Sequence, residues 1–210
     1  MSRILAIDPQ HPDPRVVTEA AETIINGGMV VIPTRHLYGL AVDALNAVAV
    51  QKVFAVKGRP ADKPLLILVE SRAAVARYAT AIPEAAHRLM DRFWPGRLTL
   101  VFDAADGLPA ALTGGSGKIG IRWPAHQVCS SLLERLPHPL TATSANRSGQ
   151  PGCHRIADLP DGLLTAVDLV LDAGPLPPGA GSSVVDMTAS PPLILRSGAL
   201  DAAHIADALV

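Results

Sequence analysis

The sequence has few aromatic residues, and it has no excess of charge of either sign. Aromatic residues make up 3% of the 210 residues and hydrophobic residues 49%, so the core must be built mainly from Ala, Val, Leu and Ile. The formal net charge is −1, so no overall field draws the chain to nucleic acid or to a membrane. Any site for a polyanion must therefore be a local concentration of cations.

Cysteines and long apolar runs are also scarce. Cys129 and Cys153 are the two cysteines, too few for a disulfide framework and not at the spacing of metal ligands. The first residues carry no signal-peptide pattern, and no apolar run reaches the length of a membrane span. We therefore expect a cytoplasmic protein with no membrane span and no metal ligands of its own.

Apolar runs separated by glycine and proline predict alternating strands and helices. The clearest predicted strands are 29–32, 65–69, 98–102, 140–143 and 167–171, and the clearest predicted helices are 14–26, 83–93 and 126–135. Several late strands follow one another without a helix, which favours an α/β fold with a twisted mixed sheet and flanking helices. The length fits one domain spanning residues 1–210. The glycine patterns of dinucleotide-binding and P-loop folds are absent from the sequence.

The most informative stretch is Lys57-Gly58-Arg59-Pro60-Ala61-Asp62-Lys63-Pro64. It places three cations within seven residues, and its glycine and prolines disfavour a regular helix. A buried strand is predicted directly after it, so we expect the cations on a loop at the end of a core strand. A rigid cationic loop of this kind can bind a triphosphate, although a solvated charged loop is the commoner alternative.

Four further loops begin with small polar or cationic residues after an apolar run. They are Thr34-Arg35-His36, Ser144-Ala145-Asn146, Ser182-Ser183 and Arg196-Ser197-Gly198. In open α/β sheets ligands gather beyond the strand ends, where hydroxyls, amides and guanidinium groups can bind phosphate oxygens. The pattern indicates a nucleotide pocket without a nucleophile. Each loop taken alone could equally be an ordinary turn or a surface cation.

A series of motifs follows one another along almost the whole chain. They are Pro33-Thr34 with Tyr38-Gly39-Leu40, Lys57-Gly58-Arg59-Pro60 with Lys63-Pro64-Leu65, Trp94-Pro95-Gly96, Ile121-Arg122-Trp123-Pro124, Ser144-Ala145-Asn146, Ser182-Ser183-Val184-Val185-Asp186 and Leu195-Arg196-Ser197-Gly198. Their order and spacing resemble the YrdC-like family of threonylcarbamoyl-AMP synthases, in its single-domain form. The paired Lys-x-Arg and Ser-x-Asn signatures are the specific part of this resemblance.

The resemblance implies a fold, a reaction and partners. The fold would be a twisted α/β sheet around a concave cationic cavity. The reaction would be that of a nucleotidyltransferase, which makes threonylcarbamoyl-adenylate and pyrophosphate from L-threonine, bicarbonate and ATP, with Mg²⁺ on the phosphates. Downstream transfer proteins would then pass the threonylcarbamoyl group to adenosine 37 of tRNA, and contact of this chain with tRNA itself would be weak.

The resemblance also implies roles for individual residues. Lys57 and Arg59 are the expected catalytic residues. The expected ATP-binding residues are Lys57, Arg59, Lys63, Lys118, Ser144, Asn146 and Arg196, and those expected to bind threonine or bicarbonate are Thr34, His36, Arg122 and Ser182. His36 stands where the family's Pro-Thr-x-Thr motif has its second threonine, so this position bears on how the amino acid is recognised.

Two other functions remain open at this point. One is an RNA-binding module of the same fold, holding double-stranded RNA or tRNA on a concave cationic surface. The net charge and the absence of basic runs interleaved with aromatic residues disfavour it. The other is a related carbamoyl-adenylate chemistry, as in hydrogenase-maturation proteins that contain a YrdC-like domain among others. Titration with ATP and with tRNA would separate an ATP-using enzyme from an RNA-binding module.

Overall fold

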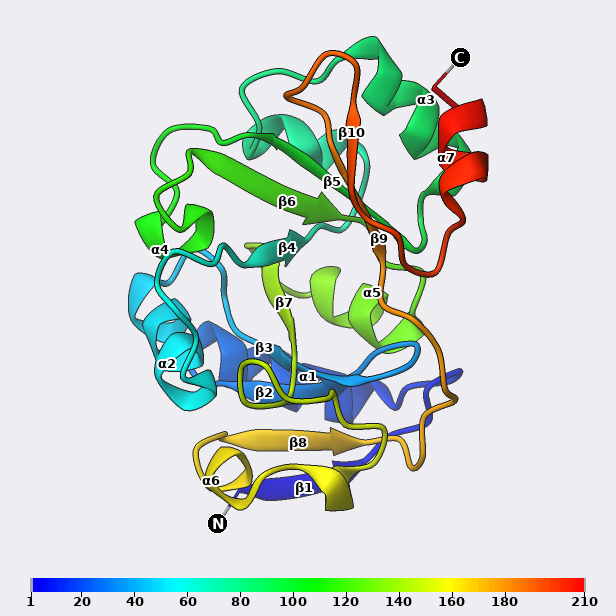
Figure 1. Cartoon of the computed structure of the whole chain (residues 1–210). Coiled ribbons are helices and arrows are strands. Elements are labelled where there is room, and N and C mark those ends of the chain that lie inside the picture. The colour runs from blue at the N-terminus through cyan, green and yellow to red at the C-terminus, as the bar shows by residue number, and fades with distance from the viewer. Residues whose placement is uncertain (1, 210) are drawn as a thin grey trace.

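A computed structural model describes residues 2–209 and contains one ten-stranded mixed sheet (Figure 1). The strand order is β1-β8-β2-β3-β7-β4-β6-β5-β9-β10. The strands are β1 (Arg3–Ala6), β2 (Val30–Pro33), β3 (Tyr38–Ala41), β4 (Leu66–Leu68), β5 (Leu98–Asp103), β6 (Lys118–Arg122), β7 (Leu140–Ser144), β8 (Leu169–Asp172), β9 (Ser183–Asp186) and β10 (Leu193–Arg196). The predicted α/β fold with a mixed sheet is confirmed.

The sheet has two halves, which β7 joins. β7 pairs antiparallel with β3 on one side and with β4 on the other, and in Figure 1 it runs between the lower and upper groups of strands. Parallel pairs occur in both halves: β1–β8 and β8–β2 in one, β4–β6 and β5–β9 in the other. The sheet therefore changes direction around β7, where a concave surface can form.

Helices cover the sheet. They are α1 (Pro14–Ile25), α2 (Ala47–Lys57), α3 (Glu84–Phe93), α4 (Ala110–Thr113), α5 (Gln127–Leu133), α6 (Asp161–Leu164) and α7 (Ala202–Asp207), with 3-10 turns at Ala73–Arg77 and Ile156–Asp158. α1 and α5 pack together against β2, because each carries apolar residues at helical spacing. α2 contacts α4 and α6, and α4 also contacts β6.

Side-chain caps define where the longer helices begin. Asp13 accepts a hydrogen bond from the Arg15 backbone N–H (2.8 Å), and Asn46 accepts one from the Ala49 backbone N–H (3.1 Å). α2 ends at Gly58, whose φ of 56° is left-handed and suits glycine.

The end of α2 corrects one prediction. Lys57 is the last residue of α2 and lies in a regular helix, not on the cationic loop. The sequence also predicts a helix from Ser71 to about residue 78, where the structure has a 3-10 turn at Ala73–Arg77. The short helices α4 and α6 were not predicted, because glycine and proline close to them obscured their helical pattern.

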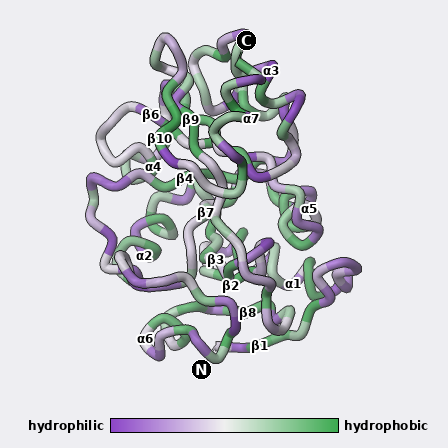
Figure 2. The backbone as a smooth tube through the Cα atoms, turned by 45° about the vertical axis from the view of Figure 1, so that its right-hand side comes forward, coloured by the Kyte–Doolittle hydropathy of each residue, from purple (hydrophilic) through white to green (hydrophobic). Residues whose placement is uncertain are grey.

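The core is aliphatic, as the composition predicts, with a few buried aromatic residues such as Tyr38 and Phe102. Figure 2 shows the hydrophobic colour on parts of both strands and helices and the hydrophilic colour on outer connections such as the loop beside α1. Among the residues described, no helix is both long and apolar enough to cross a membrane.

Candidate active site

A cavity of about 550 Å³ lies on the concave side of the sheet. Strand alternation places every second residue of neighbouring strands on its wall. These are Lys118, Gly120 and Arg122 of β6, Thr99 and Val101 of β5, and Val184 and Asp186 of β9. The consecutive residues Thr141, Ala142, Thr143 and Ser144 of β7 also line the cavity. One face of the sheet therefore forms much of the cavity wall.

Gly120 separates two cations on β6. Lys118 and Arg122 lie four residues apart on an extended strand, so their Cα atoms are about 13 Å apart. A Cβ on Gly120 would lie 3.2 Å from the Leu66 Cβ, closer than packing normally allows. The missing side chain keeps the wall open between two cationic ends.

Arg122 is a half-buried cation of the wall. Its Nε donates to the Gly96 carbonyl oxygen at 2.7 Å. Burial lowers the pKa of the guanidinium, and the positive charges of Arg196, Arg35 and Arg97 lower it further. Such a concentration of like charge favours an anionic ligand at this end of the cavity.

Ser182, Thr99 and Arg196 form a bonded group beside Arg122. The Ser182 and Thr99 hydroxyls lie 2.8 Å apart. The Arg196 guanidinium donates to the Ser182 carbonyl oxygen from Nε (3.0 Å) and from Nη2 (2.7 Å). Gly198 permits this approach, because a Cβ there would lie 2.4 Å from the Gly181 carbonyl oxygen. Three segments of the chain, around residues 99, 182 and 196, thus place two hydroxyls and a guanidinium together.

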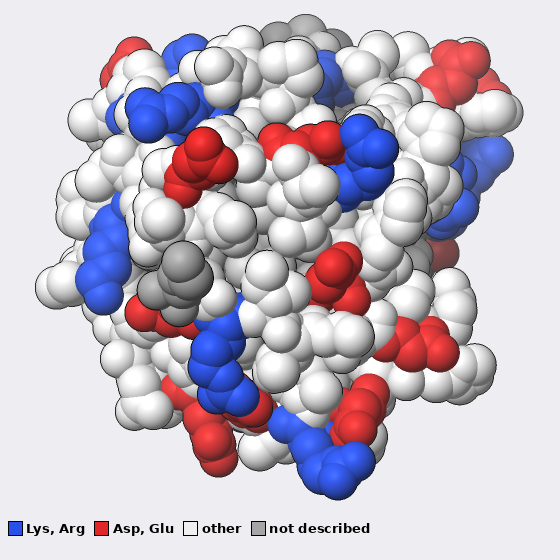
Figure 3. Space-filling view, turned by 90° about the horizontal axis from the view of Figure 1, so that it is seen from below, with Lys and Arg blue, Asp and Glu red and all other residues white. Residues whose placement is uncertain are grey.

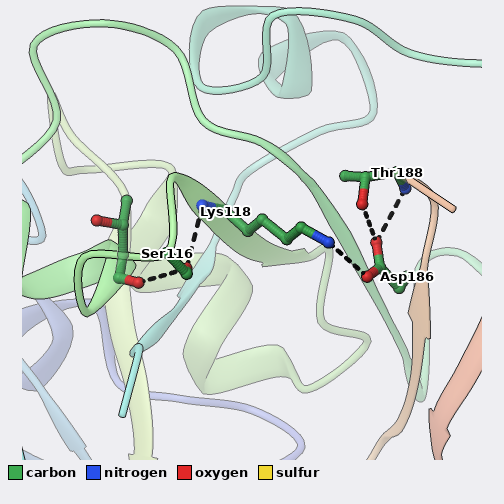
Figure 4. Close-up of polar contacts among 5 residues, drawn as sticks. Ser116, Lys118, Asp186 and Thr188 are labelled. Atoms are coloured by element: carbon green, nitrogen blue, oxygen red, sulfur yellow. Dashed lines mark hydrogen bonds and ion pairs between the residues drawn. The ribbon is translucent and has the colours of Figure 1, made fainter. Parts of the chain in front are cut away.

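Lys118 and Asp186 form an ion pair at the other end of β6 (Figure 4). The Lys118 Nζ lies 2.8 Å from the Asp186 Oδ2, and the Asp186 Oδ1 accepts hydrogen bonds from the Thr188 backbone N–H (2.9 Å) and hydroxyl (2.7 Å). Burial acts to raise the pKa of Asp186, but these hydrogen bonds outweigh it and lower the pKa. Asp186 is therefore a carboxylate at neutral pH.

Arg59 reaches the cavity from the cationic loop, whereas Lys63 does not. The Arg59 guanidinium donates to the carbonyl oxygens of Lys63 (3.1 Å) and Pro64 (2.8 Å), which fixes its direction. Lys63 itself is exposed and is not part of the wall. Gly114 packs against this loop, since a Cβ there would lie 2.7 Å from the Asp62 carbonyl oxygen.

Lys57 lies behind the wall and binds the 144–150 loop. Its side chain is 2% exposed, and its ammonium donates to the Ser144 carbonyl oxygen and to both the carbonyl (2.8 Å) and side-chain (2.7 Å) oxygens of Asn146. Burial lowers the pKa of Lys57 to about 8, and the charge of Arg59 adds to this effect. Only Ser144 of this group faces the cavity.

Thr34 lines the cavity beside β3, whereas His36 does not. The Thr34 hydroxyl donates to the Leu37 carbonyl oxygen at 2.5 Å. The His36 Nδ1 lies 3.1 Å from the Pro177 carbonyl oxygen, and its ring occupies the space that a side chain on Gly179 would need. His36 therefore contacts the 174–181 segment in this structure.

The cavity thus brings together most of the predicted site residues: Thr34, Arg59, Lys118, Arg122, Ser144, Ser182 and Arg196. Lys57, Lys63, Asn146 and His36 lie outside its wall. Sequence reasoning did not assign a role to Tyr38, Thr99 or Asp186, which also line it. Tyr38 and Asp186 stand inside the recognised motifs, and strand alternation marks Asp186 and Thr99 as facing the same way as their cationic neighbours.

Comparison with known proteins identifies the family. The sequence model of the Sua5, YciO and YrdC protein family, described as "Telomere recombination", matches residues 22–198. This chain belongs to the Sua5/YciO/YrdC family. The resemblance seen in its motifs is confirmed.

Members of the family with curated names are similar over most of the chain. A threonylcarbamoyl-AMP synthase of Pyrococcus abyssi is 39% identical, and the match covers 86% of this chain and 53% of that protein. A putative threonylcarbamoyl-AMP synthase of Mycobacterium leprae is 36% identical, with 96% of this chain and 92% of that protein covered. The chain therefore spans about half of the first relative and nearly all of the second.

The fold also matches a solved structure of the family. The crystal structure of P. abyssi Sua5 complexed with L-threonine superposes with a TM-score of 0.93 at 35% identity. The match covers 99% of this chain and 61% of that one. The family thus includes a protein of this fold that binds an amino acid.

Proposed function

We propose that this chain is an enzyme, an L-threonylcarbamoyladenylate synthase, which makes threonylcarbamoyl-AMP and pyrophosphate from L-threonine, bicarbonate and ATP. Residues 1–210 would act as one domain in the cytoplasm. The product would serve the downstream proteins that modify adenosine 37 of tRNA. The observation that carries the proposal is the cavity wall, where Arg59, Lys118, Arg122 and Arg196 surround hydroxyl groups on the scaffold of a threonine-binding relative.

The proposed chemistry matches the side chains of the wall. The threonine amine first combines with bicarbonate to give a carbamate and water. A carbamate oxygen then attacks the α-phosphorus of ATP, and the bond to the β-phosphate oxygen breaks, which releases pyrophosphate. Guanidinium and ammonium groups stabilise the negative charge on the phosphate oxygens as this bond changes, and no enzyme nucleophile is required.

The two ends of β6 suggest where the reactants bind. Arg122, Ser182 and Arg196 offer a guanidinium fork and hydroxyls, which suit a carboxylate or bicarbonate. Thr34, which directly follows β2, lines the same cavity. Lys118 lies at the opposite end of β6 and Arg59 on the cationic loop, and both suit the phosphates.

Mg²⁺ would enter as part of the nucleotide. The described residues contain no group of three His, Cys, Asp or Glu side chains that could hold a metal ion, and the one carboxylate on the cavity wall, Asp186, is already bonded to Lys118 and Thr188. These residues do not form a resident metal site. We therefore treat the ion as a companion of the ATP phosphates, whose charge it would partly neutralise.

A product assay with single omissions tests the proposal. The full chain with L-threonine, bicarbonate, Mg²⁺ and ATP should release pyrophosphate and form threonylcarbamoyl-AMP, detected by mass spectrometry. Omitting any one of threonine, bicarbonate or ATP should abolish the product. Pyrophosphate release that does not depend on threonine would contradict the assignment.

No observation favours RNA binding as a separate function. The face in Figure 3 carries acidic and basic side chains interspersed with uncharged ones. A protein surface that binds the phosphate backbone of RNA needs a continuous basic region. The face in Figure 3 shows no such region, and the formal net charge of the chain is −1. We expect titration with tRNA at physiological salt to show at most weak binding.

A further inference from the structure

Asp186 is an acidic side chain in a cavity whose other charged lining residues are cationic. Among the described residues that line the cavity, it is the only carboxylate. A carboxylate repels the phosphates of a nucleotide, so its presence there needs a physical reason. The chemistry proposed above does not use it.

The geometry couples Asp186 to Lys118 across β5. Asp186 pairs with Val101, and Lys118 pairs with Asp103, two residues further along the same strand. The Lys118 side chain extends past β5 to reach the Asp186 Oδ2 at 2.8 Å (Figure 4). The contact therefore depends on three neighbouring strands being in register.

Asp186 is the fixed member of this pair. Its side chain is 10% exposed, whereas that of Lys118 is 39% exposed. Both hydrogen bonds from Thr188 hold Oδ1, which leaves Oδ2 directed at the ammonium. Ser116 accepts a hydrogen bond from the Lys118 backbone N–H (3.2 Å), so the backbone of Lys118 is also held. A flexible lysine is thereby kept at one place on the cavity wall.

We propose that Asp186 is a positioning residue, which fixes the Lys118 ammonium so that it binds an anionic oxygen of the nucleotide. This inference rests on the proposed function. One Nζ–H bond is used by Asp186, and two remain for phosphate oxygens. Holding the lysine before the nucleotide arrives lowers the entropic cost of binding.

An alternative role for Asp186 is to bind the ammonium group of the amino acid. The contacts favour positioning, because Oδ1 is occupied by Thr188 and Oδ2 by Lys118. The two roles make opposite kinetic predictions. Positioning acts on ATP, whereas direct binding acts on threonine.

The test uses Asp186→Asn, Lys118→Met and the double variant in the full chain. Asp186→Asn should raise the KM for ATP by roughly three- to tenfold and change the KM for L-threonine by less than about twofold. Lys118→Met should have at least as large an effect. The double variant should resemble Lys118→Met alone, because Asp186 acts through the lysine.

Two further variants keep the test decisive. Thr188→Val removes one hydrogen bond to Oδ1 without changing charge, and it should raise the KM for ATP less than Asp186→Asn does. Asp43→Asn is the matched control: Asp43 accepts the Leu45 backbone N–H (2.8 Å) and pairs with His138 (2.9 Å) away from the cavity. It should leave both KM values unchanged. Calorimetric titration with ATP measures binding. The Tm of each variant, measured by circular dichroism, shows that the variant is folded at the titration temperature.

Several results would overturn the inference. They are an unchanged ATP affinity in folded Asp186→Asn and Thr188→Val, additive effects in the double variant, or a raised threonine KM with an unaltered ATP KM. A wild-type chain that neither binds ATP nor forms product would instead refute the proposed function itself.

Discussion

At the scale of single residues, Lys57 shows how a charged side chain can serve a site without lying on its surface. Its ammonium donates to oxygens of Ser144 and Asn146, and its own carbonyl oxygen accepts from the Ser148 backbone N–H (2.8 Å). The Lys-x-Arg and Ser-x-Asn signatures are thus parts of one bonded unit. Within it, Arg59 and Ser144 face the cavity, and Lys57 and Asn146 hold the loop behind them.

Replacing Lys57 should therefore destabilise the protein. Lys57→Ala removes three hydrogen bonds to oxygens of Ser144 and Asn146 and leaves the Asn146 carbonyl oxygen without its donor, so the free energy of unfolding should fall by about 2–4 kcal/mol. Lys63→Ala, at an exposed lysine of the loop that follows α2, should change the free energy of unfolding by less than about 0.5 kcal/mol. Urea unfolding of the two variants checks this. A Lys57→Ala protein of full stability that has lost ATP binding would show that the lysine contacts the nucleotide directly.

The charges of the site were predictable from the sequence, but the burial of some of them was not. Arg59, Arg122 and Arg196 stand next to strands or prolines in recognisable motifs, so their place near a ligand could be predicted. The sequence separates Lys57 from Asn146 by almost ninety residues, and their contact depends on how α2 packs against the end of β7. Pattern and propensity carry no information about such a contact.

At the scale of elements, the 174–181 segment is held at the rim of the cavity by side chains from elsewhere. Gly181 lines the cavity. The His36 ring packs on Gly179, and the Tyr38 hydroxyl donates to the Gly174 carbonyl oxygen (2.7 Å). His36 departs from the family motif, and its contact here is with this segment.

Shortening His36 should loosen the 174–181 segment. His36→Ala removes the Nδ1 contact with Pro177 and the packing on Gly179, so backbone amides of the segment should exchange with deuterium roughly three- to tenfold faster. Hydrogen exchange with mass spectrometry measures this. His138→Ala, at a histidine that pairs with Asp43, is the control. Unchanged exchange in 174–181 would show that the other contacts of the segment, such as the hydrogen bonds of Tyr38 with Gly174 and of Leu176 with His154, are sufficient to hold it.

A second element-scale prediction concerns the close approach of the 196–198 and 181–182 segments. A Cβ on Gly198 would meet the Gly181 carbonyl oxygen at 2.4 Å and the Ser182 backbone at 2.7 Å. Gly198→Ala should push the segments apart, lower stability by about 1–3 kcal/mol and weaken substrate binding through Arg196. Gly162→Ala is the control, because an added Cβ there meets only the flexible end of the Arg147 side chain, at 3.3 Å. Equal losses in both variants would show that the close approach of the two segments is not the cause.

At the scale of the whole molecule, the strand order is the feature that sequence patterns do not contain. Apolar runs locate most strands, because alternating glycine and proline mark their ends. They do not show that β8 inserts between β1 and β2, or that β7 lies between β3 and β4. These pairings come from long-range packing, and they place residues from most of the chain around one cavity.

Tyr38 illustrates how this long-range order is maintained. Its backbone N–H donates to the Cys153 carbonyl oxygen (2.9 Å), and its carbonyl oxygen accepts from the Ala145 N–H (2.8 Å). Its buried hydroxyl accepts from the Ala173 N–H (3.0 Å) and donates to Gly174. One residue of β3 thus connects three segments that are distant in the sequence. Burial raises the pKa of this hydroxyl to about 12, with Asp172 adding to the shift against an opposing hydrogen bond from Ala173.

The raised pKa of Tyr38 predicts how stability changes at alkaline pH. An unfolded tyrosine ionises near its usual pKa of 10, whereas Tyr38 stays protonated in the folded state up to about 12. The stabilisation linked to this proton is complete below pH 10 and is lost as the pH rises towards 12. Wild type should therefore lose up to about 2.7 kcal/mol more than Tyr38→Phe over this interval.

Urea unfolding of wild type and Tyr38→Phe at several pH values from about 8 to 11.5 measures this difference directly. Because all other titrating groups are common to both proteins, their contributions cancel in the comparison. The stability gap between wild type and variant should be largest near pH 8 and shrink steadily above pH 10. Two curves that stay parallel across the interval would mean that the hydroxyl ionises at the same pH in the folded and unfolded chains, and its buried bonds to Gly174 and Ala173 would then not control its proton.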